Sequence, residues 1–176
     1  MSRDTALQDL LDKQAITEVL QRYSRTLDWL DDEGQAGCYW PDAHIDYGFF
    51  TGSAAEFVPV VMAIERASQR RWHLLSTPAI RFDSADHAEV ECYGMATGIR
   101  QQDDGTWSGG LYGGRYLDAF ERRTGENGAE WRIARRRYIM DWKTPLDDQP
   151  SNEPNPDFPL PVLQIIASGH ADYRRM

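Results

Sequence analysis

The period at which apolar residues recur changes once along this chain, near Arg70, and the change limits what the chain can fold into. Before Arg70, apolar residues recur every three or four positions, which is typical of amphipathic helices. After it, apolar and polar residues alternate, which is typical of strands with one buried face. Helices followed by a run of strands predict an α+β domain, because a parallel sheet needs helices between its strands.

A long first helix is predicted from about Leu7 to Leu27. Leu7, Leu10 and Leu11 lie on a different side of this helix from its main apolar stripe. They would contact another element or a neighbouring subunit, or form a separate first turn. The main stripe has the spacing that buries one helix face, and it consists of Ile16, Val19, Leu20, Tyr23, Leu27 and Leu30.

Two shorter helices are expected before the period changes. One spans Asp31–Trp40 and ends at Pro41, because proline disfavours continuation of a helix. The other spans Ala54–Ser68, with Ser53 as its N-cap. Between them, the aromatic segment Ile45–Phe50 is predicted to be a short strand. The apolar side of the helix at 54–68 is expected to carry Phe57, Val60, Val61 and Ile64.

Four longer strands follow, and short turns of polar and glycine residues join them. Short connections between long successive strands make neighbours antiparallel. One face of the second strand carries small side chains from Ala88 to Gly98, which leave space above the sheet. A curved sheet wrapped on helices forms a hollow, and hollows are where ligands bind. The strands are predicted at Trp72–Phe82, Ala88–Arg100, Ser108–Arg122 and Trp131–Trp142.

The charge balance bears on the class of partner. The 176 residues include 19 basic and 28 acidic side chains, a net charge of −9, which disfavours nucleic acid and anionic membranes as partners. No apolar run approaches the roughly 18 residues of a membrane-spanning helix. The N-terminus lacks the apolar centre of a signal peptide, so we expect a cytoplasmic protein. A small molecule is the expected partner.

Known metal and cofactor motifs are not found in the sequence. Cys38 and Cys92 form no C-x-x-C motif, and two buried free thiols are favoured over a single disulfide. The four histidines lack the spacing of a local metal site. The glycines of Ser108–Arg115 fit neither a dinucleotide-binding nor a phosphate-binding loop. We therefore predict neither a metal nor a cofactor.

The composition changes after Trp142, which divides the chain into a domain at 1–142 and an extended tail at 143–176. Six prolines lie among Asp, Asn and Glu residues in the tail, a composition typical of unpacked chain. Leu160–Ser168 is apolar again and is expected to dock on the domain or on another subunit.

Four side chains are candidates for chemistry. His73 has the ordinary pKa best matched to proton transfer near neutral pH, although a structural histidine would fit the same strand. Asp28 follows the first helix and would hold a histidine tautomer, or simply end the helix. Tyr23 is the polar-tipped member of the helix stripe. Arg135 would bind an oxyanion or a leaving group if it pointed inward, and would be an ordinary exposed arginine otherwise.

The order and spacing of six short motifs resemble the SnoaL-like branch of the nuclear transport factor 2-like superfamily. This superfamily includes scytalone dehydratase, bile acid 7α-dehydratase and hexachlorocyclohexane dehydrochlorinase. The resemblance implies a cone of helices packed in a strongly curved antiparallel sheet, with a deep pocket. The motifs are Ile16-x-x-Val-Leu-x-Arg-Tyr23-x-x-x-Leu-Asp28, Trp40-Pro-Asp-Ala43, His73-Leu-Leu-Ser76, Gly114-Arg-Tyr-Leu-Asp118, Trp131-Arg-Ile-Ala-Arg135 and Asp141-Trp142.

The same resemblance implies a function. In the family's lyases a histidine acts as base and an aspartate from the end of the first helix supports it, roles that fall on His73 and Asp28. A tyrosine of the first helix falls on Tyr23, and an arginine of the last strand falls on Arg135. The implied reaction is a cofactor-independent elimination of water, with loss of halide or of a small carbonyl fragment as related reactions.

Two other classes of function stay open, and the resemblance extends to quaternary structure. One class is a cyclase or isomerase that uses the same base, and the other is a non-catalytic subunit like that of ring-hydroxylating dioxygenases. A homotrimer or homodimer is expected.

Several aromatic residues indicate an apolar, aromatic or polycyclic substrate, namely Trp29, Trp40, Tyr47, Phe49 and Tyr112.

Overall fold

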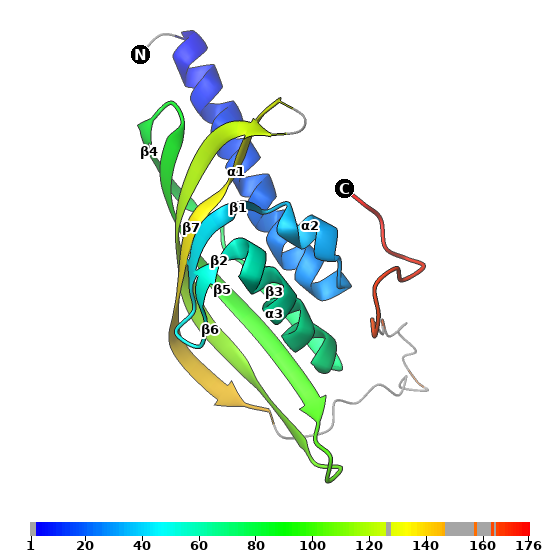
Figure 1. Cartoon of the computed structure of the whole chain (residues 1–176). Coiled ribbons are helices and arrows are strands. Elements are labelled where there is room, and N and C mark those ends of the chain that lie inside the picture. Colours follow the sequence, from blue (N-terminus) through cyan, green and yellow to red (C-terminus); the bar gives the residue numbers. More distant parts are fainter. Residues whose placement is uncertain (1–2, 126–127, 147–156, 158–162, 164) are drawn as a thin grey trace.

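A computed structural model describes residues 3–125, 128–146, 157, 163 and 165–176. Within these residues three helices lie on one side of a strongly curved seven-stranded sheet (Figure 1). The expected α+β architecture is confirmed. The elements are α1 (Arg3–Trp29), α2 (Asp32–Ala36), β1 (Tyr39–Asp46), β2 (Thr51–Ser53), α3 (Ala54–Ala67), β3 (Arg70–Leu75), β4 (Ala79–Ser84), β5 (His87–Gln101), β6 (Trp107–Gly125) and β7 (Gly128–Pro145).

The sheet has the order β2-β1-β7-β6-β5-β3, with β4 also paired to β5. The long strands β5, β6 and β7 are antiparallel neighbours, as their short connections predicted. β1 pairs with β7 in parallel, which periodicity could not predict because it does not identify partners. The helices pack against the inner face of this sheet, and the core lies between the two layers.

The first helix follows its predicted stripe, since every residue of that stripe is buried. α1 ends at Trp29, and the φ of 58° at the next residue, Leu30, is unusual for a residue with a side chain. Complete burial of the Leu30 side chain in the core stabilises this conformation. The N–H of Asp31 closes the helix by donating to the carbonyl oxygen of Thr26 at 2.9 Å. This ending fixes the direction of the last turn of α1.

Three predicted segments were wrong in their type or continuity. The strand expected at Ile45–Phe50 covers only the last two residues of β1, and 47–50 form the turn before β2. The helix expected at Asp31–Trp40 is only the short α2, and Pro41 lies inside β1. β1 tolerates this proline because its pairing with β7 shifts between Tyr39 and His44, where no ladder bond is lost. The strand expected at Trp72–Phe82 is divided into β3 and β4, since Pro78 in the connection has no N–H to donate.

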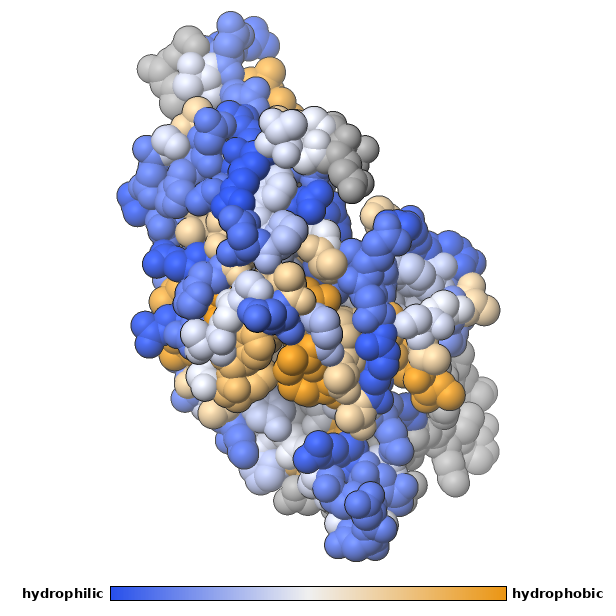
Figure 2. Space-filling model, in the orientation of Figure 1, coloured by the Kyte–Doolittle hydropathy of each residue, from blue (hydrophilic) through white to orange (hydrophobic). Residues whose placement is uncertain are grey.

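α3 was predicted at the right place but with its apolar stripe rotated. Its N-terminus carries the expected Ser53 cap, and Glu56 completes a capping box. Val60 and Ile64 are 39% and 45% exposed, and the buried side lies one position further round the helix. Figure 2 shows apolar residues across the middle of the face that α3 presents to the viewer. The buried residues of α3 are Ala54, Phe57, Val58, Val61, Met62 and Glu65.

A β-bulge in β7 decides which arginine of the basic cluster faces the core. Opposite β6, Ala119 pairs with Arg135 and Phe120 pairs with Ile133, so Ala134 is an extra residue. The bulge reverses the alternation, so Arg136 becomes fully buried while Arg135 faces outward. Arg136 forms two hydrogen bonds to the buried carboxylate of Asp118, at 2.8 and 2.6 Å. Its guanidinium also lies over the rings of Tyr23, Tyr39 and Tyr116.

The C-terminal residues 165–176 run beside the end of α1 (Figure 1). Ser168 donates to the carbonyl oxygen of Leu30 at 2.7 Å, and Tyr173 donates to Asp31. Ile165 is half-buried against the core, so this part of the expected apolar segment docks on the domain. The strand β7 extends to Pro145, past the expected boundary at 142, and residues 147–156, 158–162 and 164 lie outside the described residues.

Two further expectations concern burial and membranes. Cys38 and Cys92 are both buried and free, as predicted, and burial raises the pKa of each thiol to about 12. None of the helices in the described ranges is both long enough and apolar enough to cross a bilayer.

Candidate active site

Two elements bring His73 and Asp28 together on the inner face of the sheet. β3 alternates, with Trp72 and Leu74 exposed on the outer face and His73 turned inward toward α1. Asp28 belongs to the last turn of α1, just before the Leu30 ending described above. Only 8% of the His73 side chain and 19% of the Asp28 side chain are exposed.

The two residues are joined by both side chain and backbone. Nδ1 of His73 lies 2.8 Å from Oδ1 of Asp28. The backbone N–H of His73 donates to Oδ2 of the same carboxylate at 3.1 Å. Because the carboxylate receives the proton of Nδ1, the other ring nitrogen, Nε2, is left as the atom that can accept a proton. The contact expected from the sequence is present.

A second carboxylate, which the sequence reasoning missed, faces the free side of the ring. Oε1 of Glu65, on the last turn of α3, lies 3.7 Å from Nε2 of His73. Glu65 is 9% exposed and shares the buried side of α3 with Phe57 and Val61. An acidic residue at helical spacing from two apolar ones was the signal in the sequence, because such a residue faces the core.

Arg71 is the nearest cation to this group. Its Nε lies 4.0 Å from Oε2 of Glu65. Its hydrogen bonds, however, go to three backbone carbonyls: that of Glu65 at 2.8 Å, that of Ile165 at 2.8 Å, and that of Ser68. Arg71 therefore offers charge to Glu65 and ties α3 to the C-terminal segment.

The surroundings shift the pKa values of the histidine and the second carboxylate. Burial alone lowers the pKa of His73, but the hydrogen bond with Asp28 and the charges of Glu65 and Asp28 leave it raised. Burial raises the pKa of Glu65, and the positive charges of His73 and Arg71 offset this only in part. Both groups therefore keep a proton to higher pH than an ordinary glutamate or histidine does.

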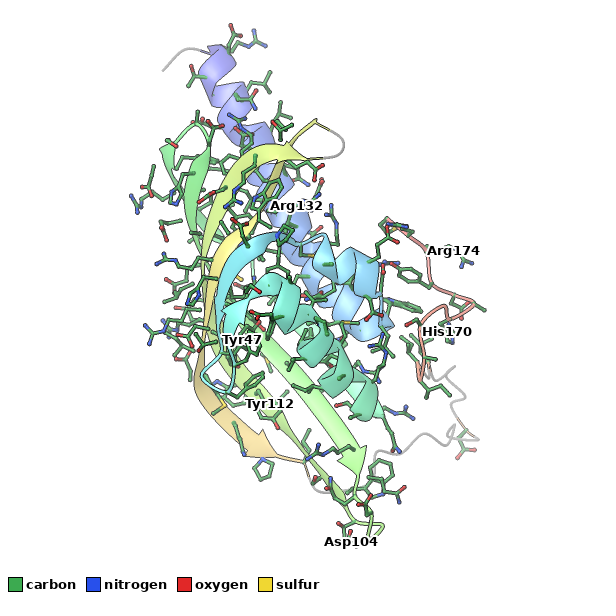
Figure 3. All side chains as sticks on the ribbon, in the orientation of Figure 1. Tyr47, Asp104, Tyr112, Arg132, His170 and Arg174 are labelled. Atoms are coloured by element: carbon green, nitrogen blue, oxygen red, sulfur yellow. The ribbon has the colours of Figure 1, made fainter. Side chains whose placement is uncertain are left out.

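The inner face beside His73 is built of small residues and one tyrosine. His73 pairs with Ala96, and Ala96 pairs with Tyr112, so the three form one row across three strands. Strands lie about 4.8 Å apart, which puts the Cα of Tyr112 roughly 10 Å from that of His73. Gly94 and Gly98 flank Ala96 on the same face, as predicted for the small-residue stripe. Tyr47 and Tyr112 both lie on the helix side of the sheet (Figure 3).

The other aromatic candidates lie in different surroundings. Trp29 packs against His170 and Tyr173 of the C-terminal segment. Figure 3 shows His170 on this segment, beside the helices. Trp40 is buried, and its indole N–H donates to the carbonyl oxygen of Glu121 at 2.9 Å. Phe49 is 64% exposed in the turn after β1. Trp40 and Phe49 are therefore not brought to the His73–Asp28 pair.

Tyr23 is not brought to the pair either. α1 continues to Trp29, so five residues of helix set Tyr23 and Asp28 about 140° apart around its axis. The Tyr23 hydroxyl forms its hydrogen bond with the hydroxyl of Tyr47, at 2.9 Å. Burial raises the pKa of Tyr23 well above its ordinary value, which keeps the hydroxyl protonated.

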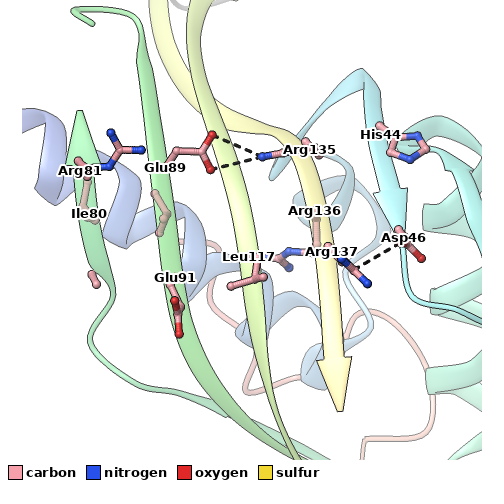
Figure 4. Close-up of a pocket in the computed structure, with 12 residues that line it drawn as sticks. His44, Asp46, Ile80, Arg81, Glu89, Glu91, Leu117, Arg135, Arg136 and Arg137 are labelled. Atoms are coloured by element: carbon pink, nitrogen blue, oxygen red, sulfur yellow. Dashed lines mark hydrogen bonds and ion pairs between the residues drawn. The ribbon is translucent and has the colours of Figure 1, made fainter. Parts of the chain in front are cut away.

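Arg135 lies on the opposite face of the sheet from His73. Figure 4 shows its guanidinium directed at Glu89, with both contacts at 3.4 Å. It lines a surface hollow of about 660 Å³ together with Arg137, Asp46 and Glu91. Of the two alternatives for Arg135, the structure shows the exposed arginine, because the bulge at Ala134 reverses the alternation of β7, so the catalytic role implied for it does not fit its position.

One group among the described residues has the composition of a metal site. Ligand atoms of Asp83, His87 and Glu89 lie within 4.8 Å of one another on the β4–β5 hairpin. Both carboxylates already pair with arginines, Asp83 with Arg81 and Glu89 with Arg135. This group is on the outer face and is separate from His73.

Comparisons with known proteins agree with this fold. A sequence profile of the family described as "SnoaL-like domain" matches residues 8–137. No curated protein matches the sequence closely enough to be reported. A putative scytalone dehydratase from Novosphingobium aromaticivorans is 21% identical, with 83% of this chain and 93% of that chain covered and a TM-score of 0.69.

Two further solved structures have the same fold. A hexachlorocyclohexane dehydrochlorinase, LinA type 2, is 20% identical over 84% of this chain and 99% of its own, with a TM-score of 0.69. A putative aromatic ring hydroxylase from Novosphingobium aromaticivorans is 20% identical over 78% of this chain and 94% of its own, with a TM-score of 0.65. Identities this low establish the fold, and the chemistry has to be argued from the residues.

Proposed function

This chain belongs to the SnoaL-like domain family of the nuclear transport factor 2-like superfamily, and we propose that it is a cofactor-independent lyase. The observation that carries the proposal is the 2.8 Å contact between His73 Nδ1 and Asp28 Oδ1. A histidine held in this way keeps a basic nitrogen available in a shielded place, which is what removal of a carbon-bound proton requires.

The proposed reaction is an elimination. Nε2 of His73 takes a proton from carbon, and the C–H electron pair becomes the second bond of a new C=C. The bond to a leaving group on the neighbouring carbon breaks, and its electron pair departs with the leaving group. Asp28 keeps the Nδ1 proton in place and stabilises the imidazolium that forms. The product is an unsaturated compound, and the leaving group departs as water.

The proposed substrate is a hydroxylated aromatic or polycyclic small molecule. Small residues flank Ala96 between His73 and Tyr112, and this arrangement supports a flat, apolar ligand lying along the sheet. Tyr47, stacked with Phe57 and Tyr138, adds aromatic surface on the same side.

A screen of hydroxylated aromatic and polycyclic ketones tests the proposal, because elimination creates a conjugated product that is followed by its absorbance. The native protein is expected to turn over such a substrate, and His73→Ala is expected to lose this activity. Turnover that survives in His73→Ala at the native rate would refute the assignment of the base.

We further propose that the protein is a homodimer or homotrimer. One row of the outer sheet face runs through Leu74, Met95, Gly113 and Trp142 on four adjacent strands. Its large side chains are unusually exposed, and those of Trp72 and Tyr93 beside them are exposed as well. The outer apolar patch is defined as Trp72, Leu74, Tyr93, Met95 and Trp142, and we assign it to contact between subunits.

A further inference from the structure

Glu65 has an environment that a structural carboxylate rarely has. It is nearly fully buried, yet no hydrogen-bond donor among the described residues reaches its carboxylate oxygens. Its closest charged neighbours are Nε2 of His73 at 3.7 Å and Nε of Arg71 at 4.0 Å. Arg71 gives its hydrogen bonds to backbone carbonyls instead. A buried carboxylate without a donor is costly to keep charged, so its retention calls for an explanation.

The position of Glu65 relative to His73 explains why a carboxyl group is retained there. Asp28 is bound at Nδ1, and Glu65 is beside Nε2, the nitrogen that the proposed reaction uses. A substrate that reaches Nε2 must therefore also come close to the carboxyl group of Glu65. At 3.7 Å the two atoms are too far apart for a direct hydrogen bond but close enough to exchange a proton after a small movement.

We propose that Glu65 is the general acid of the site, which gives the departing hydroxyl group its proton. This inference rests on the proposed elimination of water and identifies the residue that assists its leaving group. Hydroxide is a poor leaving group and needs a proton as it departs, whereas a halide or a carboxylate leaves without one. A buried acid beside the base is thus of use to a dehydratase and of little use to a dehydrochlorinase.

The proton balance closes over one cycle. Glu65 begins protonated and His73 neutral. His73 Nε2 takes the proton from carbon, the C–O bond breaks with its electron pair on oxygen, and Glu65 gives its proton to that oxygen, so water leaves. The site then holds an imidazolium and a carboxylate 3.7 Å apart. Transfer of the proton from Nε2 to Oε1 restores the starting state.

The pKa of Glu65 is shifted in the direction that this assignment needs, because burial raises it and so favours the protonated acid of the first step. The pKa of His73 is raised in part by the charge of Glu65, and that contribution is lost when Glu65 carries its proton. The groups that face the pair are Asp28 from α1 and Arg71 from β3, and the paired position on β5 is the uncharged Ala96.

Two probes with the same carbon skeleton separate an acid from a structural residue. The first is the aldol adduct of benzaldehyde and acetone, which loses water to give benzylideneacetone. The second is the acetate ester of that adduct, which gives the same product but expels acetate without a proton. Glu65→Gln is expected to lower the ratio of the hydroxyl rate to the acetate rate by about 10²-fold or more, with the effect in kcat. Glu18→Gln, an exposed change on α1, is the matched control.

The outcomes distinguish this inference from the proposed function. Loss of both rates in His73→Ala with an unchanged rate ratio in Glu65→Gln overturns the role of Glu65 alone. Retention of both rates in His73→Ala overturns the elimination itself. Equal loss of both rates in Glu65→Gln indicates a merely structural residue and also overturns the role.

A titration that needs no substrate decides the protonation state on which the inference stands. Nuclear magnetic resonance, with nitrogen-15 in the histidines and carbon-13 in the glutamate carboxyl groups, follows His73 and Glu65 in the same sample. The Glu65 carbon is identified as the signal that Glu65→Gln removes and Glu18→Gln keeps. It is expected to report a protonated carboxyl group at pH values at which Nε2 of His73 has no proton. A Glu65 carboxyl group that is ionised wherever His73 is neutral overturns the proposal, whether or not either probe is turned over.

Discussion

Asp28 binds His73 twice, through the ring nitrogen Nδ1 at 2.8 Å and through the backbone N–H at 3.1 Å. One carboxylate thus orients the imidazole and fixes the strand that carries it to the end of α1. This double contact means that Asp28 and His73 should behave as one unit when either is changed.

Changes to the pair are expected to be non-additive. His73→Ala should lower kcat by about 10²–10⁴-fold, the usual contribution of a general base. Asp28→Asn should also lower kcat, because the amide no longer stabilises the imidazolium. The double variant should be scarcely slower than His73→Ala alone. Steady-state kinetics of the three variants measure kcat, and circular dichroism checks that each variant is folded. A double variant whose loss equals the product of the two single losses would contradict the prediction.

The pH dependence of activity follows from the raised pKa of His73. A base works only when neutral, so kcat/KM should fall as pH falls through that pKa, with a midpoint above the ordinary histidine value of about 6.5. In Asp28→Asn the midpoint should move to lower pH, because the hydrogen bond and charge of Asp28 raise the pKa. A pH–rate profile of each protein gives both midpoints, and an unchanged midpoint in the variant would count against the contact.

Stability should depend on the same proton. A histidine whose folded pKa is raised stabilises the fold fully below its unfolded pKa, and this contribution is lost as pH rises through the folded value. The free energy of unfolding of the native protein relative to His73→Gln should therefore be larger at about pH 6 than at about pH 9. Urea denaturation of both proteins at the two pH values measures this difference in the free energy of unfolding. A larger difference at about pH 9 than at about pH 6 would contradict the raised pKa of His73.

Two adjacent arginines of β7 should respond very differently to the same change. Arg136→Met leaves Asp118 buried without its partner, and the loss of a buried partner typically costs about 3–5 kcal/mol. Arg135→Met, on the exposed face, should change stability by no more than about 0.5 kcal/mol. Chemical denaturation compares the two variants. Equal costs would mean that the face assignment of β7 is incorrect.

The outer apolar patch should hold subunits together. Light scattering of the native protein should give a mass of two or three times the 20.2 kDa of one chain. Leu74→Lys places a charge within the patch and should reduce the mass toward that of one chain. The control is Val60→Lys, which also replaces an exposed apolar residue with lysine but lies on the exposed side of α3. It should leave the mass unaltered. A native mass of one chain would refute the assignment.

The sequence predicted the features that depend on local periodicity. The stripe of α1 from Ile16 to Leu30 and the antiparallel run of long strands needed only the spacing of apolar residues. The contact of His73 with Asp28 came from the resemblance to a family, because two residues 45 positions apart share no local pattern. Simple alternation along β7 would put Arg135 on the same face as Ile133. The extra residue Ala134 reverses the alternation and puts Arg136 there instead.

Other features depend on tertiary structure that spacing does not encode. The rotation of α3 that buries Glu65 and exposes Ile64 is decided by how α3 meets β1 and α2. The parallel pairing of β1 with β7 joins the two ends of the domain, and the chain between them gives no hint of it. The rotation of α3 matters for the site, since α3 carries Glu65.

The extra residue Ala134 also matters for comparing this chain with its relatives. A relative without that residue has the same inward position on β7, but one place earlier in its own sequence. An alignment that puts the gap on the wrong side of Ala134 would match Arg135 to an arginine that is buried in the relative. Assignments of function transferred along β7 should therefore follow the facing residue on β6, Asp118 or Ala119, and not the order of letters in the chain.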